Sequence, residues 1–480
     1  MKRILNYVLP LFALLAIIAP FVFILMYAVL TPPIYEDTFV GVLDEKYERL
    51  NSVEGEKIVV IGGSSVAFGL DSDLLEKYTG MPVVNFGLYA ALGTKLMLDL
   101  SLSGIGKGDV VVISPEMDAQ TLSLFFNAET AWRGIEGNPS MLFSIGFDNI
   151  SEMLGGAFVY AGEKLSGKHA SEDESVYLAK YFDEYGDFSG YPRHENKMLA
   201  YYDTNTPIEL RRAAYGEELS DFIDYLNKYI AKCRLRGAEV YFSYGPMNSL
   251  AISEASTPDE RAKLCEYLES EIDCEFITEL DLAIFDPGYF FDTNFHLNDA
   301  GMRARTLRLS RDLRLACGIV GPVVEDEPPA PELPFVDVEF LGYDENSRYF
   351  TYELLPMGAY AIVGLSDEGR TMESLTLPLG FDGRKVASVR SGALASARLK
   401  TVIISAESNL KIFENGAFLD TPALTDLWIY KTTGDAIAPP LDFYGTAESF
   451  RVHVPEGSDF GYHYYWSERG LDFVYDAVTE

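Results

Sequence analysis

The first thirty-five residues contain a long uncharged run, which restricts what the whole chain can become. No charged residue occurs from Ile4 to Tyr35. Its apolar part, Ile4 to Leu30, would span roughly 40 Å as a helix, against about 30 Å for the hydrocarbon core of a bilayer. A cleavable signal peptide has a shorter apolar stretch, and Tyr27–Leu30 followed by Thr-Pro-Pro is a poor cleavage site. We therefore expect an uncleaved transmembrane anchor over residues 1–35.

The charges around this run set its expected orientation. Lys2 and Arg3 precede it, whereas Glu36 and Asp37 follow it. Because positive residues favour the cytoplasmic side, we expect a single-pass protein with its amino terminus in the cytoplasm and its remaining domains outside the cell. The chain carries 73 acidic against 38 basic residues, a net charge of −35, and this excess argues against nucleic acid as a partner.

The middle of the chain alternates between short β-branched runs and helical patterns. Strands are expected at 57–62, 83–86, 109–114 and 240–243, with helices at 71–79, 219–233 and 298–318 and another starting at 257. Continuous apolar strands separated by helices indicate a parallel sheet covered on both faces. We expect a flavodoxin-like, three-layer α/β/α domain over 36–320, with an insertion at about 115–215.

A change of texture follows this domain. Five prolines mixed with acidic residues predict an extended interdomain linker over 321–334. Beyond it, Val389–Leu394 and the apolar residues to Ile404 are repeated by Phe413–Phe418 and the residues to Ile429, with an offset of 24 to 25 residues. A period in the twenties predicts a small β-rich leucine-rich-repeat solenoid over 335–480.

Several short motifs of this region resemble the BspA-type leucine-rich repeat of bacterial surface proteins. They are 360–364, 375–378, the two Gly-Ala-Leu/Phe turns and the closing 452–458 with Tyr462 and Trp466. The resemblance covers about 355–480. It implies a module outside the cell that binds a protein or glycan ligand, or acts as a spacer, without chemistry of its own.

Two distant stretches could together carry chemistry. The first strand ends in Gly62-Gly63-Ser64-Ser65, and a serine on such a turn stands at the carboxyl edge of the sheet, where open α/β folds bind ligands. Far along the chain, His296 precedes the last helix, with Asp292 four residues upstream. A serine becomes a nucleophile when an imidazole takes its proton and an acid orients that imidazole. A tight turn with a helix cap is the competing reading of the glycine–serine segment.

At these residues the chain, over roughly 55–317, resembles the SGNH (GDSL-like) hydrolase superfamily, and within it the DltD-like and envelope acyltransferase branches. Gly63-Ser64-Ser65 with Gly69 is similar to the G-D-S block, which implies that Ser65 is the nucleophile and that Ser64 replaces the Asp. The resemblance also implies that His296 is the catalytic base.

The second block of that family is matched by Asn85-Phe86-Gly87. By resemblance, the amides of Ser65 and Gly87 form the oxyanion hole, and Asn85 lies near the site. Two positions depart from the pattern. Thr293 stands where the family has its Asp, which leaves Asp292 as the acid of a triad or leaves a Ser–His dyad. Glu116 lies where the family has an Asn that stabilises the oxyanion.

Other candidates are weaker. His194, in the insertion, is a possible site-lining residue together with Ser64, Asn85 and Glu116, although a solvated loop histidine is the simpler interpretation. The arginines at 303, 305, 308, 311 and 314 wind around the last helix and are interpreted as its solvated side. Four cysteines without a CxxC pair, and the lack of a phosphate-binding glycine loop, argue against a metal or an organic cofactor.

Two functions from different classes stay open. The resemblance implies a membrane-anchored, extracellular serine esterase or O-acyltransferase that acts on acyl esters of cell-envelope glycans. The alternative is a catalytically inactive surface adhesion or scaffold protein that binds a partner through its repeats. The displaced acid and the carboxylate at position 116 are the reasons to keep the second.

Overall fold

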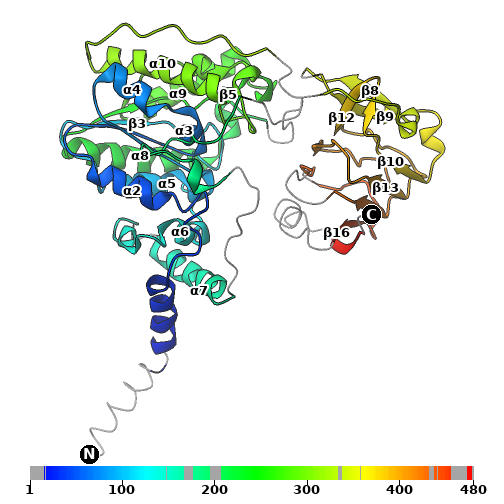
Figure 1. Ribbon diagram of the computed structural model, residues 1–480, viewed down its shortest axis with the longest axis horizontal. Coiled ribbons are helices and arrows are strands. Elements are labelled where there is room, and N and C mark those ends of the chain that lie inside the picture. Colours follow the sequence, from blue (N-terminus) through cyan, green and yellow to red (C-terminus); the bar gives the residue numbers. More distant parts are fainter. Residues whose placement is uncertain are drawn as a thin grey trace, which may run out of the picture. The chain divides into compact units, whose positions relative to one another are not determined.

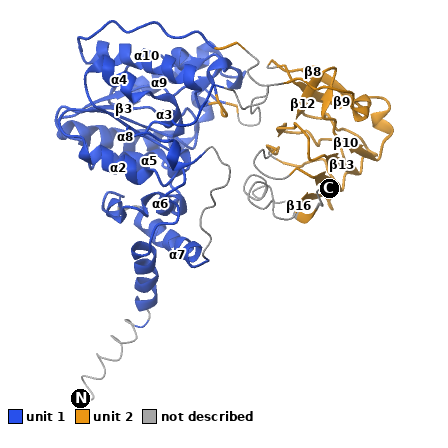
Figure 2. Cartoon of the chain, viewed as in Figure 1, with its two compact units in different colours: residues 1–194, 208–290, 295–330 blue, residues 195–207, 291–294, 331–480 orange. Residues whose placement is uncertain are grey.

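The structure is a computed structural model that describes residues 16, 18–146, 149–166, 177–194, 207–332, 338–356, 358–431, 437–440, 442–455 and 473–477. Two compact units make up the chain (Figure 2). The first comprises 1–194, 208–290 and 295–330, and the second comprises 195–207, 291–294 and 331–480.

The first unit is built on a five-stranded parallel sheet with the order β2-β1-β3-β4-β6. Its strands are β1 (Ile58–Gly62), β2 (Val83–Gly87), β3 (Val110–Ile113), β4 (Glu239–Phe242) and β6 (Glu275–Phe276). A separate short pair joins β5 (Met247–Asn248) to β7 (Ile284–Phe285). The first four strands coincide with the β-branched runs expected from the sequence. A mixed α/β fold with a parallel sheet, consistent with a flavodoxin-like domain, is therefore confirmed.

Helices cover both faces of this sheet (Figure 1). Their bounds are α2 (Leu43–Ser52), α3 (Ser64–Gly69), α4 (Ser72–Thr79), α5 (Thr94–Ser101), α6 (Ala128–Ile135), α7 (Ile150–Ser166), α8 (Glu217–Leu235), α9 (Pro258–Glu271) and α10 (Asp299–Ala316). On one face, Leu309 and Leu313 of α10 pack with Leu75 of α4 against Ile58 and Val60 of β1. In Figure 1, α2, α5 and α8 lie on the other side of the sheet.

Side-chain caps fix where several helices begin. Asp71 accepts a hydrogen bond from the amide of Leu74 at the start of α4, and Asn298 accepts one from Gly301 at the start of α10. Thr257 caps α9, whose first residue is Pro258. An oxygen at this position satisfies a backbone N–H that has no partner within the helix. The cap at Asn298 matters for function because it fixes the chain two residues after His296.

The insertion and the N-terminal residues adjoin each other in the first unit. Residues 18–30 are helical and lead into the domain next to α6 and α7 (Figure 1). Among the described residues, no helix is both long enough and apolar enough to cross a bilayer. The expected membrane-spanning helix is therefore not found, and residues 1–15 and 17 of that expected anchor lie outside the described residues.

The predicted linker is attached to α10 over its first part. Glu325 pairs with Arg303 at 2.7 Å, and Glu327 pairs with Arg308 at 2.5 Å and Arg311 at 2.7 Å. The interpretation of these arginines as simply solvated is therefore wrong, because they hold the acidic segment along the helix. Residues 333 and 334 of the predicted linker lie outside the described residues.

The second unit is β-rich. One parallel sheet has the order β10-β13-β15-β16-β17, and a further sheet has the order β11-β12-β9-β8 with β14 beside β12. The bounds are β8 (Phe350–Leu354), β9 (Tyr360–Leu365), β10 (Ser374–Thr376), β11 (Gly380–Phe381), β12 (Arg384–Val389), β13 (Thr401–Ile404), β14 (Ile412–Phe413), β15 (Asp426–Ile429), β16 (Arg451–Pro455) and β17 (Phe473–Ala477).

The parallel sheet of this unit repeats with the period seen in the sequence. Val402 of β13 lies beside Leu427 of β15, which lies beside Val452 of β16, so equivalent residues are 25 positions apart. All three side chains are buried in one apolar core with Leu375 of β10. Each strand thus covers its apolar face with its neighbours, as a repeat architecture requires. The predicted motif residues Tyr462 and Trp466 lie outside the described residues.

Candidate active site

Two glycines avoid steric conflict in the turn from β1 into α3. A Cβ on Gly62 would lie 2.3 Å from the carbonyl oxygen of Ser114, and a Cβ on Gly63 would lie 2.3 Å from a carboxylate oxygen of Glu116. Gly63 is the extended residue before the helix, and α3 begins at Ser64. The strand therefore turns sharply at its carboxyl end and presents Ser64 in the first turn of the helix.

Ser64 is the hydroxyl that meets the predicted histidine. Its Oγ lies 2.8 Å from Nε2 of His296, although the two residues are 232 positions apart in the sequence. The serine is half-buried, and the imidazole residue is 6% exposed. A serine hydroxyl at this distance from an imidazole nitrogen is in position to lose its proton to that base.

Ser65, the nucleophile expected from the resemblance, lies elsewhere. It is 0% exposed, and its Oγ is buried without a hydrogen-bond partner among the described residues. The assignment of the histidine's serine partner moves from Ser65 to Ser64. The physical reason is helical geometry, since successive residues point about 100° apart around the axis, at 3.6 residues per turn.

The imidazole of His296 is held by aromatic rings. The ring of Phe68, from α3, stacks on it with 4.0 Å between centroids and an interplanar angle of 4°. The hydroxyl of Tyr177 lies 3.5 Å from its Nδ1. Phe68 itself stacks on Phe188 at 4.3 Å, so the residue under the imidazole is fixed from its other side.

The predicted acid, Asp292, is half-buried and belongs to the segment 291–294 that groups with the second unit. Its role as third member of a triad stays a prediction.

The expected oxyanion donors are engaged within the chain. The amide of Ser65 donates to Oε1 of Glu116 at 2.8 Å, and the amide of Gly87 donates to Oδ1 of Asn85 at 3.1 Å. Asn85 is fully buried and donates to the carbonyl of Val66 at 3.0 Å and to Asp187 at 2.7 Å. Asn85 therefore holds β2 against α3, and its expected place as a site-lining residue is not supported.

Glu116 lies directly behind the serine turn. Burial raises the pKa of its carboxyl, while the hydrogen bond from the Ser65 amide acts in the opposite direction. Its second oxygen, Oε2, is buried without a hydrogen-bond partner among the described residues. A carboxyl with a raised pKa can hold a proton, and the oxygen without a partner is then a hydrogen-bond donor.

Two buried arginines also hold the site, and no sequence pattern marks them. Arg305 of α10 donates to the carbonyl of Ser65 at 2.7 Å and to the hydroxyl of Ser114 at 2.8 Å. It also explains Gly69, because a Cβ there would lie 2.5 Å from its guanidinium. Burial lowers the pKa of Arg305 to about 10, and the charge of Glu116 opposes that shift. Arg305 thus fixes the serine turn by binding the carbonyl of Ser65 and the hydroxyl of Ser114.

The second missed arginine stands beside a predicted residue. His194 is exposed, whereas Arg193 is buried and donates to the carbonyls of Phe68 at 2.6 Å and Leu297 at 3.1 Å. It therefore ties α3, which carries the serine, to the residue that follows His296. No local pattern in the sequence marks this role, because the contacts join residues more than a hundred positions apart.

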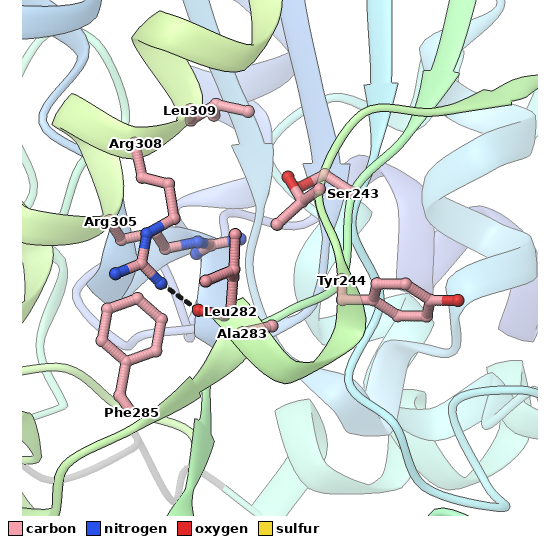
Figure 3. Close-up of a pocket in the computed structure, with 9 residues that line it drawn as sticks. Ser243, Tyr244, Leu282, Ala283, Phe285, Arg305, Arg308 and Leu309 are labelled. Carbon is pink, nitrogen blue, oxygen red and sulfur yellow. Dashed lines mark hydrogen bonds between the residues drawn. The ribbon is translucent and has the colours of Figure 1, made fainter. Parts of the chain in front are cut away.

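A small pocket lies between α10 and the carboxyl end of β4 (Figure 3). Ser243, Tyr244, Phe285, Arg305 and Arg308 are among its lining residues, and Arg308 donates to the carbonyl of Leu282. The guanidinium of Arg308 also lies 4.7 Å from the centroid of the Phe285 ring. Neither Ser64 nor His296 lines this pocket.

The described residues contain no group of three or more His, Cys, Asp or Glu side chains that could hold a metal ion. All four cysteines are free. What the arrangement offers chemically is a partly exposed hydroxyl, an imidazole in contact with it, and a buried carboxyl behind the turn. No protein-family model, curated protein or solved structure matches the chain.

Proposed function

We propose that the chain is an SGNH-type serine esterase or O-acyltransferase. In this proposal it is anchored in a bacterial membrane, lies outside the cell, and acts on acyl esters of cell-envelope glycans. A BspA-type leucine-rich repeat domain follows the enzyme domain and binds a protein or glycan. The observation that carries the catalytic part is the 2.8 Å contact between Ser64 Oγ and His296 Nε2.

The contact supports a two-step acyl transfer. His296 removes the proton of Ser64 as Oγ attacks the acyl carbonyl, and a tetrahedral oxyanion forms. When this intermediate collapses, His296 protonates the leaving oxygen, and an acyl-serine remains. Water or a sugar hydroxyl then attacks the acyl-serine and gives up its proton to His296. As this second intermediate collapses, the bond to Oγ breaks, His296 returns the proton to Ser64, and the acid or the new ester is released. These steps balance without a cofactor.

The oxyanion needs hydrogen-bond donors beside Ser64. Because the amide of Ser65 is bonded to Oε1 of Glu116, we infer that the carboxyl of Glu116 takes part as a neutral acid, with its proton on Oε2. A neutral carboxyl can donate to a developing negative charge, whereas the anion would repel it. The upward shift of the Glu116 pKa supports this protonation state.

The experiment is covalent labelling of the full chain with a fluorophosphonate probe, followed by mass spectrometry of the peptide that contains Gly62–Gly69. We expect the label on Ser64. Ser64→Ala should abolish labelling and reduce p-nitrophenyl acetate hydrolysis by on the order of a thousandfold or more. Labelling of Ser65, or hydrolysis unchanged in Ser64→Ala, would contradict the assignment.

The adjacent serine provides the matched control. Ser65→Ala removes a fully buried hydroxyl and keeps the hydrogen bond from the amide of residue 65 to Glu116. We expect this variant to label like the unaltered chain. The pair separates loss of a nucleophile from general damage to the turn, since both substitutions remove one oxygen from the same segment.

A second function is favoured by one specific observation, the occupied amides of Ser65 and Gly87. If these donors cannot be released, the chain is an inactive surface adhesion or scaffold protein that binds a partner through its repeats. That function predicts no probe labelling at any serine, together with binding of a glycan or protein ligand that is lost when the outward face of the β10–β17 sheet is altered.

A further inference from the structure

One helix of the first unit exposes an apolar face that the proposed reaction does not use. Along α7, the residues Ile150, Leu154, Phe158 and Leu165 are exposed, with Leu154 at 48% and Leu165 at 70%. Their spacing places them on one side of the helix. A neighbouring side of α7 is buried and carries Met153, Ala157, Tyr160 and Ala161. The helix therefore packs inward normally and still presents large apolar side chains outward.

The exposed face of α7 adjoins the apolar N-terminal helix over residues 18–30. The ring of Phe158 meets the ring of Phe21 edge to face, with 5.5 Å between centroids. Near the other end of the contact, Lys164 Nζ donates to the carbonyls of Ala28 at 3.2 Å and Thr31 at 3.0 Å. The N-terminal helix exposes Phe21, Phe23, Met26 and Leu30 as well. Two neighbouring helices thus expose apolar side chains on a shared region of surface.

Polar contacts then fix the chain that leaves the N-terminal helix. Glu136, just after α6, accepts hydrogen bonds from the amide of Ile34 at 2.8 Å and from the amide of Tyr35. The ring of Tyr35 lies 5.2 Å from the guanidinium of Arg133, which pairs with Glu163 of α7. These groups join residues 34–35 to both α6 and α7, and the bonds from Lys164 hold the C-terminal end of the N-terminal helix against α7.

We propose that α7 is an interfacial helix whose outward face enters the surface layer of the same bilayer that receives the N-terminal helix. Continuity between the two apolar surfaces identifies lipid as the occupant. Charge supports apolar insertion over attraction to lipid headgroups, since the chain has a net charge of −35 and none of the exposed residues of α7 is Lys or Arg. Amphipathic helices of this kind lie in the plane of the interface with the apolar face several ångströms deep.

The consequence is that the first unit is held at the membrane at two places, by the N-terminal residues and by α7. A single flexible attachment would let the unit tumble. Two attachments joined by the Glu136 and Lys164 contacts restrict its orientation, so the Ser64 site keeps a constant height above the lipid surface. This inference rests on the membrane anchoring in the proposed function, but it does not depend on the proposed reaction.

The test uses the full chain in phosphatidylcholine vesicles with a polarity-sensitive fluorophore attached to a single introduced thiol. Leu154→Cys places the fluorophore on α7, and Met26→Cys places it on the N-terminal helix. The matched control is Leu235→Cys, because Leu235 is 88% exposed at the end of α8. The unsubstituted chain, labelled in parallel, gives the background from the native cysteines.

We expect lipids that carry a nitroxide near the headgroup to quench the fluorophore at 154 strongly and the one at 235 hardly at all. The quenching at 154 should persist at high salt, because insertion is apolar. Quenching at 26 without quenching at 154 would overturn the inference and leave the anchor intact. Quenching at neither position would overturn it as well. Fluorophosphonate labelling of the same preparations reports the proposed catalysis separately.

Discussion

The two units bury different kinds of side chain. The first unit encloses many ionisable residues, among them Lys46, Glu116, Asp187, Arg193 and Arg305. The second encloses a nearly continuous apolar core of Leu, Val, Ile and Phe side chains from β8 to β16. Its described buried polar residues are mainly serine and threonine, with Lys411 and His453.

This difference is in line with the proposed assignment of the reaction to the first unit and of ligand binding to the second. Burying a charge costs free energy unless hydrogen bonds or an opposite charge compensate it, so such groups persist where they position a reactive atom. In the first unit, Arg305 and Arg193 both end on backbone carbonyls next to the Ser64–His296 contact. The interior of the second unit is mainly apolar packing, and the outward side chains of its strands are more exposed.

The largest test of this contrast is Arg305→Met. Removing the buried guanidinium leaves the carbonyl of Ser65 and the hydroxyl of Ser114 without their hydrogen-bond donor. We expect the first unit to lose roughly 3–5 kcal/mol of unfolding free energy, with the second unit unaffected. Hydrogen exchange followed by mass spectrometry reports the two units separately.

Arg303→Met is the control for that prediction. Arg303 lies on the same helix and makes a partly exposed ion pair with Glu325. Such pairs contribute about 0–1 kcal/mol, so protection of the first unit should barely change. Equal losses of unfolding free energy in the two variants would mean that the burial of Arg305 does not increase its contribution to stability.

Glu116 tests whether a buried ionisable side chain serves catalysis as well as stability. Because burial raises the pKa of this carboxyl, its neutral form persists to higher pH than an ordinary glutamic acid. Catalytic support from the neutral acid should be present below its folded pKa and decline as pH rises through it. Glu116→Gln keeps a donor that does not ionise, so its rate should not show this decline.

Glu116→Leu removes the donor altogether. We expect its esterase rate to fall by roughly a hundredfold to a thousandfold, the effect of losing one oxyanion donor. The measurement is the pH dependence of kcat/KM for the unaltered chain and both variants. A Gln variant as slow as the Leu variant would show that the carboxyl acts as an anion or only as a structural group.

In the second unit the matching prediction concerns packing. Leu427 of β15 is fully buried between Val402 and Val452. We expect Leu427→Ala to reduce the unfolding free energy of the second unit by roughly 2–4 kcal/mol, because it leaves a cavity in the apolar core of that unit. Ile403→Ala, on the outward side of β13, should cost much less. Labelling of Ser64 should stay the same in both, and its loss would show that the units are not energetically separate.

The parts of this molecule that depend on local patterns could be predicted from the sequence. Continuous β-branched runs predicted β1 to β4, and a spacing of 24 to 25 residues predicted the stacked strands of the second unit. His296 was found because it directly precedes a capped helix. These signals are contained within about ten residues, or within one repeat.

Other features depended on contacts that no local pattern encodes. The choice between Ser64 and Ser65 depends on the residue at which α3 begins, and an error of one residue turns the side chain by about 100°. Arg305 looked like one of five surface arginines, yet it meets a carbonyl 240 positions away. Arg193 likewise gains its role from Phe68 and Leu297, which lie far from it in the sequence.

The smallest expected effect concerns His453 of the second unit, a largely buried histidine. His453 lies between two carboxylates, 2.9 Å from Asp426 and 2.8 Å from Asp476, and stacks on Trp428. Burial would raise the pKa of Asp426, but hydrogen bonds from Thr425 and His453 outweigh it and hold the pKa below its usual value.

A carboxyl with a lowered folded pKa stabilises the fold above its unfolded pKa, and this contribution disappears as pH falls through the folded value. Asp426→Asn should therefore leave the second unit with a flatter loss of stability below about pH 4, by less than about 1 kcal/mol because the group is partly exposed. Urea unfolding of that unit between acidic and neutral pH measures the slope. Ser64 and His296 belong to the first unit. A parallel change in fluorophosphonate labelling of Ser64 would therefore mean that the Asp426–His453 contact affects the candidate active site.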